Sequence, residues 1–270
     1  MHFKIRSFRT AFFLIVLSLF CSSTGLADDI SYLHALSRPL NPNRPASSAA
    51  APRVAIIIDD LGMNLALAQS FLDLPVPVSF SILPGLAHSR EIAELAHLKN
   101  RDVLCHIPME PYKYPKVNAG DYSLLSSMDT QSLEKALKAD LAFVPYIVGA
   151  NNHMGSKLTE NERIMRLVLG HLKNLDLFFI DSVTSPNSKA FQLAREMGLR
   201  TARRNVFLDS TLDPDFIEAQ FRKLKNSALS LGSSIGIGHP NPATISVLRD
   251  MIPEFEASGI RFVPVSELAR

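Results

Sequence analysis

The chain contains, at residues 54–62, the stretch Val54-Ala55-Ile56-Ile57-Ile58-Asp59-Asp60-Leu61-Gly62. Its first five residues are apolar and mostly β-branched without polar alternation, which predicts a strand buried on both faces. The strand then runs into two adjacent carboxylates. Neighbouring carboxylates repel each other, and burying either one without a partner costs free energy. The stretch therefore indicates a site at which a metal ion, a base or both make use of Asp59 and Asp60.

The composition is that of a globular protein with an ample core. The 270 residues are 47% hydrophobic and carry a formal net charge of +2. This balance excludes a disordered or fibrous chain. The charges of both signs are interspersed, and the sequence has neither a basic–aromatic stripe nor a Gly-rich phosphate loop. We therefore expect no nucleic-acid partner.

The N-terminus has the pattern of a secretory signal peptide over residues 1–27. Three basic residues precede an apolar run at 11–20, and small residues before Asp28 suit cleavage. The apolar run is short for a bilayer span. We expect export, cleavage and no stable membrane insertion afterwards, with an uncleaved N-terminal anchor as the alternative.

Cys105 is the one cysteine that such cleavage leaves in the chain. An intrachain disulfide is then excluded, and a lone thiol next to a strand-like run is most often buried as a small apolar side chain. Export without disulfides is compatible with the bacterial periplasm. We expect the mature protein to be periplasmic.

Residues 28–52 have the composition of a linker, because prolines occur among Asn, Ser and Ala without sustained periodicity. The folded unit is expected over 53–270. This region has no second break in composition and no repeat of fixed period, which predicts a single domain.

Strand-like and helical patterns alternate through this domain. The strand-like runs are 54–58, 78–83, 103–105, 146–149, 177–180, 199–203 with 206–208, 235–238 and 262–265. Regular alternation with helices predicts a parallel sheet covered by helices. Eight strand candidates favour an irregular, TIM-type β/α barrel, with an open doubly wound sheet as the alternative.

Polar residues that can do chemistry recur where these strands end. They are Asp59, Asp60, His106, Asn152, His153, Asp181 and His239. In a parallel barrel the carboxyl ends of all strands lie on one face, so we expect these residues to meet at one mouth. Consecutive strand residues point to opposite faces. A turn at 61–62 is therefore expected to bring both aspartates to the same site.

One carboxylate and two imidazoles form a familiar ligand set for Zn²⁺ and leave a position for water or substrate. We expect Asp60, His106 and His153 to bind the metal, although Co²⁺, Ni²⁺ or Mn²⁺ would also fit such a set. Asp59, next to a ligand, is then placed to accept a proton from water. His239 is placed to protonate a leaving amine.

Other polar residues near the strand ends have two interpretations each. Asp181 either caps the next helix or orients a ligating histidine. Arg203 and Arg204 form a structural ion pair with Asp209 at the barrel mouth, or they orient Asp59. The segment 159–162, Thr-Glu-Asn-Glu, predicts a capping box at the start of a helix.

Six short motifs together resemble those of the divergent polysaccharide deacetylases, bacterial exported relatives of the NodB-type carbohydrate esterases. The motifs are Ile58-Asp59-Asp60-Leu61-Gly62, His106-Ile107-Pro108-Met109-Glu110-Pro111, Asn151-Asn152-His153-Met154-Gly155-Ser156, Phe179-Ile180-Asp181-Ser182, Phe207-Leu208-Asp209 and Gly238-His239-Pro240. The resemblance covers essentially all of residues 53–270.

The resemblance implies a NodB-like β/α barrel and metal-dependent removal of N-acetyl groups from an amino-sugar polysaccharide or a peptidoglycan-type glycan. In that family an Asp-Asp pair provides first a base and then a metal ligand, which corresponds to Asp59 and Asp60. A late histidine acts as the acid, which corresponds to His239. We expect a hydrolase whose partner is an N-acetylated carbohydrate of the cell envelope. The alternative is a barrel that binds a glycan or an envelope protein and keeps the metal without useful catalysis.

Two features depart from the family's usual pattern. Typical members take both imidazoles from one His-x-x-x-His loop, whereas here Glu110 stands four residues after His106. The second imidazole must come from His153 on another strand, or Glu110 ligates instead. The chain also has no tryptophan, a residue that often lines the family's site. We assign contacts with substrate, or support of the ligands, to Glu110, Asn152, Asp181, Arg203 and Asp209.

Overall fold

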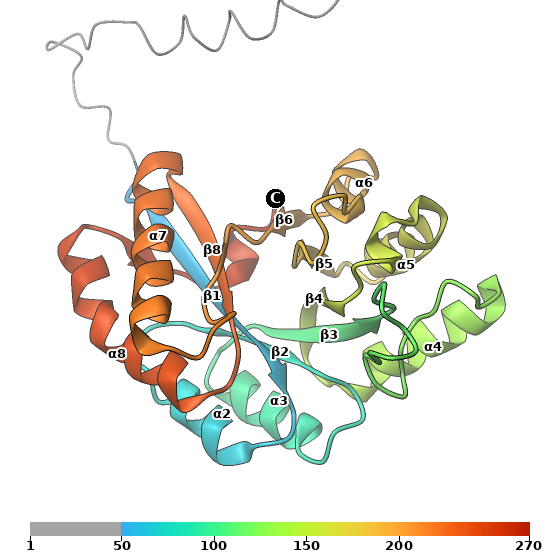
Figure 1. Ribbon diagram of the computed structural model, residues 1–270, viewed down its shortest axis with the longest axis horizontal. Helices are drawn as coiled ribbons and strands as arrows, with labels where there is room; N and C mark the ends of the chain where they lie inside the picture. The colour runs from blue at the N-terminus through green and yellow to red at the C-terminus, as the bar shows by residue number, and fades with distance from the viewer. Residues whose placement is uncertain (1–49) are drawn as a thin grey trace, which may run out of the picture. The chain divides into compact units, whose positions relative to one another are not determined.

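The computed structural model describes residues 50–270 (Figure 1). The predicted signal peptide and nearly all of the predicted linker lie outside this range and stay predictions. The described region is one compact unit. None of its helices combines the length and the apolar character that a bilayer crossing needs.

Its strands form one sheet in which every pairing is parallel. The sheet order is β6-β5-β4-β3-β2-β1-β8-β7, with β9 paired to β1. The strands are β1 (Arg53–Leu61), β2 (Ser79–Ile82), β3 (Val103–Met109), β4 (Ile147–Met154), β5 (Phe178–Asp181), β6 (Thr201–Arg203), β7 (Val206–Phe207), β8 (Ser233–Gly238) and β9 (Arg261–Phe262).

The helices connect successive strands and lie around the outside of the curved sheet (Figure 1). They are α2 (Leu65–Leu72), α3 (Ser89–Leu98), α4 (Thr130–Phe143), α5 (Glu162–Asn174), α6 (Ala190–Glu196), α7 (Pro214–Leu231) and α8 (Pro242–Ala257), with 3₁₀ turns η1 (Leu158–Glu160) and η2 (Val265–Glu267). The predicted capping box is wrong in detail. Asn161 is the N-cap of α5, and its side chain accepts a hydrogen bond from the backbone N–H of Ile164 at 3.2 Å.

One short segment joins the two ends of the sheet. Its first part, β6, pairs with β5, and its second part, β7, pairs with β8 on the opposite end. Two residues bridge the change of partner: the N–H of Arg204 bonds the Asp181 carbonyl, and the N–H of Asn205 bonds the Ile235 carbonyl. The predicted irregular barrel is therefore confirmed, and the open doubly wound sheet is not the fold.

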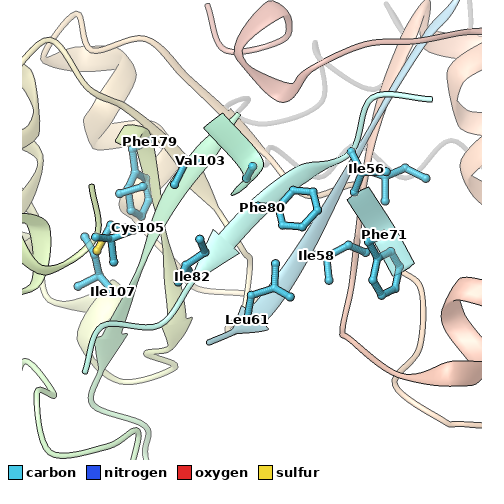
Figure 2. Close-up of a cluster of buried hydrophobic side chains, with 14 of the residues drawn as sticks. Ile56, Ile58, Leu61, Phe71, Phe80, Ile82, Val103, Cys105, Ile107 and Phe179 are labelled. Carbon is cyan, nitrogen blue, oxygen red and sulfur yellow. The ribbon is translucent and has the colours of Figure 1, made fainter. Parts of the chain in front are cut away.

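Alternation along the strands separates two apolar clusters. On β1, Ile56 and Ile58 face outward and pack with residues such as Phe71 and Phe80 in the large core between sheet and helices (Figure 2). Ala55 and Ile57 face the barrel interior. Fully burying such a side chain contributes about 1.5–3 kcal/mol. This two-sided burial explains the unbroken apolar run that predicted the strand.

The C-terminal segment fills the end of the barrel where the strands begin. Val263, Val265 and Leu268 belong to the interior cluster. The backbone of Arg270 exchanges two hydrogen bonds with that of Thr201, at 3.0 and 3.1 Å. The interior is thus mainly apolar and closed at this end, where the Val265 N–H donates a buried hydrogen bond to the hydroxyl of Ser79, at 3.0 Å.

Two titratable groups lie buried between α4 and β3. The thiol of Cys105 is fully buried, as predicted, and contacts the backbone carbonyl of Asp140. The Asp140 side chain is 1% exposed, and neither carboxyl oxygen has a hydrogen-bond partner among residues 50–270. This burial raises the pKa of Asp140 from 3.8 to about 8. Asp140 is consequently held as a neutral acid at pH 7.

We expect Asp140 to make folding stability depend on pH. Below pH 3.8 its carboxyl group is protonated in both states, so its contribution to stability is fully present. As the pH rises towards about 8 the unfolded chain ionises first. Stability is therefore lost, by at most about 1.4 kcal/mol per pH unit. Asp140→Asn removes this dependence on pH. In urea unfolding, the free energy of unfolding of Asp140→Asn relative to that of the wild type should therefore increase from pH 5 to 8.

Asp250→Asn, at an exposed position of α8, is the matched control and should not change with pH in this way. If the free energies of unfolding of Asp140→Asn and the wild type differed by the same amount across this pH range, the raised pKa of Asp140 would be contradicted.

Candidate active site

The two aspartates of the opening stretch reach the same site through a β-bulge. Ile58 pairs with Phe80 and Leu61 with Ile82, so two residues of β1, Asp59 and Asp60, lie opposite one residue of β2. Asp60 has φ of 57°, a left-handed conformation that Asp tolerates better than most residues. The expected change of direction is thus at Asp60 itself, before Leu61-Gly62.

Three side chains from three strands converge at the mouth of the barrel. The Nδ1 atom of His153 lies 2.7 Å from Oδ1 of Asp60. The Nε2 atom of His106 lies 3.2 Å from the same oxygen and 3.3 Å from Nδ1 of His153. These residues form the one group of possible metal ligands among residues 50–270. The structure thus brings together the three side chains that the sequence predicts as ligands.

The donor atoms of this cluster suit a cation. Oδ1 of Asp60 is buried and accepts no hydrogen bond of good geometry, although two ring nitrogens lie close to it. Nδ1 of His106 is 2.9 Å from Oδ1 of Asn151, which leaves Nε2 facing the cluster. One carboxylate and two imidazoles are ligands that Zn²⁺ accepts. The residues present therefore fit a divalent metal.

In this cluster, the effect of neighbouring charges on the pKa of Asp60 and on that of His106 outweighs the effect of burial. Burial acts to raise the pKa of Asp60, but the imidazoles of His106 and His153 outweigh it and hold the pKa below its usual range. Burial acts to lower the pKa of His106, but Asp59 and then Asp60 outweigh it and raise that pKa. Asp60 is therefore an anion, as a metal ligand must be.

Asp59 lies beneath the cluster and is 3% exposed. Its Oδ1 accepts a hydrogen bond from Nδ2 of Asn151 at 2.8 Å. Its Oδ2 lies 3.6 Å from Nε2 of His106. One oxygen is thus held by the protein, and the other faces the cluster, where a base would act.

His239, at the end of β8, approaches the cluster from the opposite side. Its Nε2 is 3.7 Å from Oδ2 of Asp60, and its Nδ1 is 2.9 Å from Oδ1 of Asp209. The other oxygen of Asp209 accepts from the backbone N–H of His239 and the hydroxyl of Thr244, at 2.7 and 2.6 Å. Burial acts to lower the pKa of His239, but Asp209 outweighs it and raises the pKa to about 9. Asp209 thus holds His239 as a proton donor. Among residues 50–270 it forms no ion pair with an arginine, so the predicted ion pair with Arg203 and Arg204 is wrong.

These groups form the floor of a cavity of about 440 Å³. Its lining also includes the segment Ser182–Thr184, which follows β5, and the residues Arg204 and Phe207. Val183 has φ of 49°, and such a conformation of a β-branched residue costs on the order of 1–3 kcal/mol. The strain lies in the wall of the site.

Polar contacts hold this strained wall in place. Asp181 accepts a hydrogen bond from the N–H of Val183 at 2.8 Å and another from the N–H of Phe191 in the first turn of α6 at 3.1 Å. Arg204 donates to the carbonyls of Ser182 and Val183, at 2.7 and 2.8 Å. Asp181 therefore has the helix-capping role that the sequence left open, and it does not contact the histidines.

Two other predicted residues also support loops. Glu110 is buried; one of its oxygens is 2.7 Å from Nζ of Lys157, and the other accepts from the N–H of Ser126 at 2.6 Å. Glu110 is not in the ligand cluster, so the structure favours His153 as its third member. Asn152 borders the cavity, but its oxygen accepts from the Ser182 N–H at 3.0 Å.

The prediction for Arg203 is wrong. Its side chain is exposed, and its guanidinium lies 5.4 Å from the ring centre of Phe191, away from the residues that line the cavity. Arg204 is the arginine at the mouth. Because the two are adjacent in an extended segment, they point to opposite sides, and the sequence alone did not say which side faces inward.

Asn151 and Ser81 are site residues that the sequence analysis missed. Both are fully buried, and Ser81 donates to Oδ1 of Asn151 at 2.6 Å. The signal that could have found Asn151 is strand alternation: since His153 points into the ligand cluster, Asn151 does too, whereas the side chain of Asn152 is directed to Ser182 in the loop after β5. Ser81 follows from the same rule on β2, between Phe80 and Ile82.

The fold and this site agree with comparisons to known proteins. Residues 56–269 match the family described as divergent polysaccharide deacetylase. The chain belongs to this family, and its curved parallel sheet with surrounding helices is the NodB-like fold.

Among its relatives, YibQ of Escherichia coli is 37% identical over 207 residues, which are 77% of this chain and 64% of YibQ. The chain thus spans less than two thirds of the length of that relative. A Haemophilus influenzae protein is 34% identical over 202 residues, 75% of this chain and 71% of its own. A crystal structure of an Agrobacterium tumefaciens protein has a TM-score of 0.78 at 25% identity and covers 83% of this chain and 92% of that one.

The ligand cluster can be tested by metal binding without any substrate. We expect Asp60→Ala, His106→Ala and His153→Ala each to weaken Zn²⁺ binding by more than the roughly 10–100-fold that loss of a supporting partner costs. Glu110→Gln should bind as the wild type does, because its carboxylate lies outside the cluster. Chelator competition and metal analysis of the folded variants provide the measurement.

His97→Ala, at an exposed position of α3, is the matched control for loss of an imidazole. Zn²⁺ retained by all three ligand variants, or lost from Glu110→Gln, would refute the ligand set.

Proposed function

We propose that this protein is a periplasmic, Zn²⁺-dependent hydrolase that removes N-acetyl groups from an amino-sugar glycan of the cell envelope. The observation that carries the proposal is the bulge at Asp60, which sets a three-ligand cluster between a carboxylate, Asp59, and an imidazole, His239. A module that only binds has no need for a base and an acid on either side of a metal. Membership of the divergent polysaccharide deacetylase family supports the substrate class.

Asp60, His106 and His153 would hold the metal. When bound, a divalent cation supplies Lewis acidity at the acyl carbonyl and makes water more acidic. Two imidazoles and a carboxylate favour Zn²⁺ among the divalent cations. The predicted signal peptide supports the periplasmic location, where peptidoglycan-type glycans are substrates of the right chemistry.

The protein's own residues then account for the proton transfers. Oδ2 of Asp59 takes a proton from the attacking water, whose oxygen bonds to the acetyl carbon. His239 gives its proton to the amide nitrogen as the carbon–nitrogen bond breaks, so the products are acetate and a free amine. Asp209 orients His239 for this transfer and stabilises its protonated form.

The proposal is tested by acetate release. The wild type loaded with Zn²⁺ should release acetate from chitooligosaccharides or peptidoglycan fragments, and chelation should abolish the release. Asp59→Asn, which keeps the shape of the base but cannot take the proton, should lower kcat by about 100-fold or more while Zn²⁺ stays bound.

Asp176→Asn, at an exposed carboxylate, serves as the control and should keep full activity. A wild type that binds Zn²⁺ but releases acetate from none of these substrates would overturn the proposal and favour a glycan-binding or envelope-protein-binding barrel.

A further inference from the structure

The side chain of Asn151 forms hydrogen bonds with both halves of the site. Its Oδ1 lies 2.9 Å from Nδ1 of His106 and accepts from the hydroxyl of Ser81 at 2.6 Å. Its Nδ2 donates to Oδ1 of Asp59 at 2.8 Å and to Oγ of Ser182 at 3.2 Å. Two lone pairs and two N–H groups are all that an amide offers. The fully buried side chain is therefore saturated.

The contacts fix which way round this amide lies. An ionised Asp59 carboxylate only accepts hydrogen bonds, so the amide N–H group must face it. The carbonyl oxygen of Asn151 then faces His106, and an acceptor there requires a proton on Nδ1 of the ring. In a neutral imidazole this leaves the lone pair on Nε2, the atom that lies 3.2 Å from Asp60 and 3.3 Å from His153.

The same amide also gives the two oxygens of Asp59 different surroundings. Oδ1 is occupied by the N–H of Asn151, whereas Oδ2 accepts no hydrogen bond from residues 50–270 and lies 3.6 Å from Nε2 of His106. The oxygen that remains accessible to a proton is thus the one nearest the ligand cluster.

We propose that Asn151 is a positioning residue that sets the tautomer of His106 for metal binding and aims the carboxylate of Asp59 at the reacting water. The second half rests on the deacetylase function proposed above, and the first does not. A serine hydroxyl has a single polar atom, and an ionised Asp has no donor, so neither offers separate donor and acceptor ends to Asp59 and His106. The need for both ends explains why an amide occupies this position.

The tautomer is measured directly, without metal and without substrate. Long-range ¹⁵N–¹H correlation spectra of the metal-free wild type, recorded where the imidazole is neutral and assigned with a His106→Gln variant, should show His106 protonated on Nδ1. A ring protonated on Nε2 in the wild type would overturn the proposal. This measurement uses the wild type, and His106→Gln is the one variant that must fold, because it is needed to assign the spectrum.

Two substitutions separate the two roles of Asn151. Asn151→Leu removes both ends of the amide, so the His106 tautomers should mix and Zn²⁺ affinity should fall by about 10–100-fold. Asn151→Asp keeps the acceptor for His106 but puts a carboxyl group against Asp59. It should therefore retain the tautomer and the Zn²⁺ affinity, with kcat reduced by about 10–100-fold and KM unchanged.

Asn226→Asp, at an exposed position of α7, controls for the added charge. Wild-type Zn²⁺ affinity in Asn151→Leu, or wild-type kcat in Asn151→Asp, would overturn the corresponding role. If Asn151→Leu fails to fold, the wild-type spectrum and Asn151→Asp still decide. A wild type that binds Zn²⁺ and has the expected tautomer but releases no acetate would refute the deacetylase function and the aiming of Asp59, while supporting the role of Asn151 towards His106.

Discussion

The bulge at Asp60 is the constraint on which the rest of the site depends. In a regular strand, residues 56, 58 and 60 would all face the helices, and Asp60 would enter the apolar core. The left-handed backbone at Asp60 inserts one extra residue opposite Ser81, so that Leu61 takes the core position and both carboxylates face the mouth. Such a conformation costs on the order of 1–2 kcal/mol. The bulge thereby places two functional carboxylates, instead of one, at the end of a single strand.

The barrel interior is arranged in layers, and these layers strengthen the polar interactions of the two carboxylates. The lower layer is mainly apolar and is closed by the C-terminal segment around Val263 and Val265, where the N–H of Val265 donates to the hydroxyl of Ser79. Above it lie the buried polar side chains of Ser81, Asn151 and Asp59, which are connected by hydrogen bonds of 2.6 and 2.8 Å. The ligand cluster lies above this polar layer. Polar interactions are stronger in a medium of low dielectric constant, and unpaired polar groups there are costly. The interior therefore holds a fixed network.

Much of this arrangement could be predicted from the sequence, because it follows from strand periodicity and from the rule that parallel strands end on one face. The alternation of apolar runs and helices gave the barrel, and the positions of Asp60, His106 and His153 at strand ends brought them together. The sequence did not show which of Arg203 and Arg204 faces the site, because a shift of one residue in strand register moves every side chain to the opposite face.

The rest could not be predicted, because it depends on local backbone geometry and on contacts between residues far apart in the chain. A left-handed Asp60 leaves no signal in composition, and Leu61-Gly62 looked the better turn. Asn152 and Asn151 are chemically identical, and only their faces differ. Glu110 could be taken for a ligand until Lys157, 47 residues away, was placed beside it. Packing in three dimensions decided each of these cases.

We expect the bulge at Asp60 to create a metal site from three strands. Crystals grown with Zn²⁺ and measured at the zinc absorption edge test it most directly. One strong anomalous peak should lie about 2.0–2.2 Å from Oδ1 of Asp60, Nε2 of His106 and Nδ1 of His153. A peak bound through Glu110, or an ordered site without any peak at saturating Zn²⁺, would contradict it.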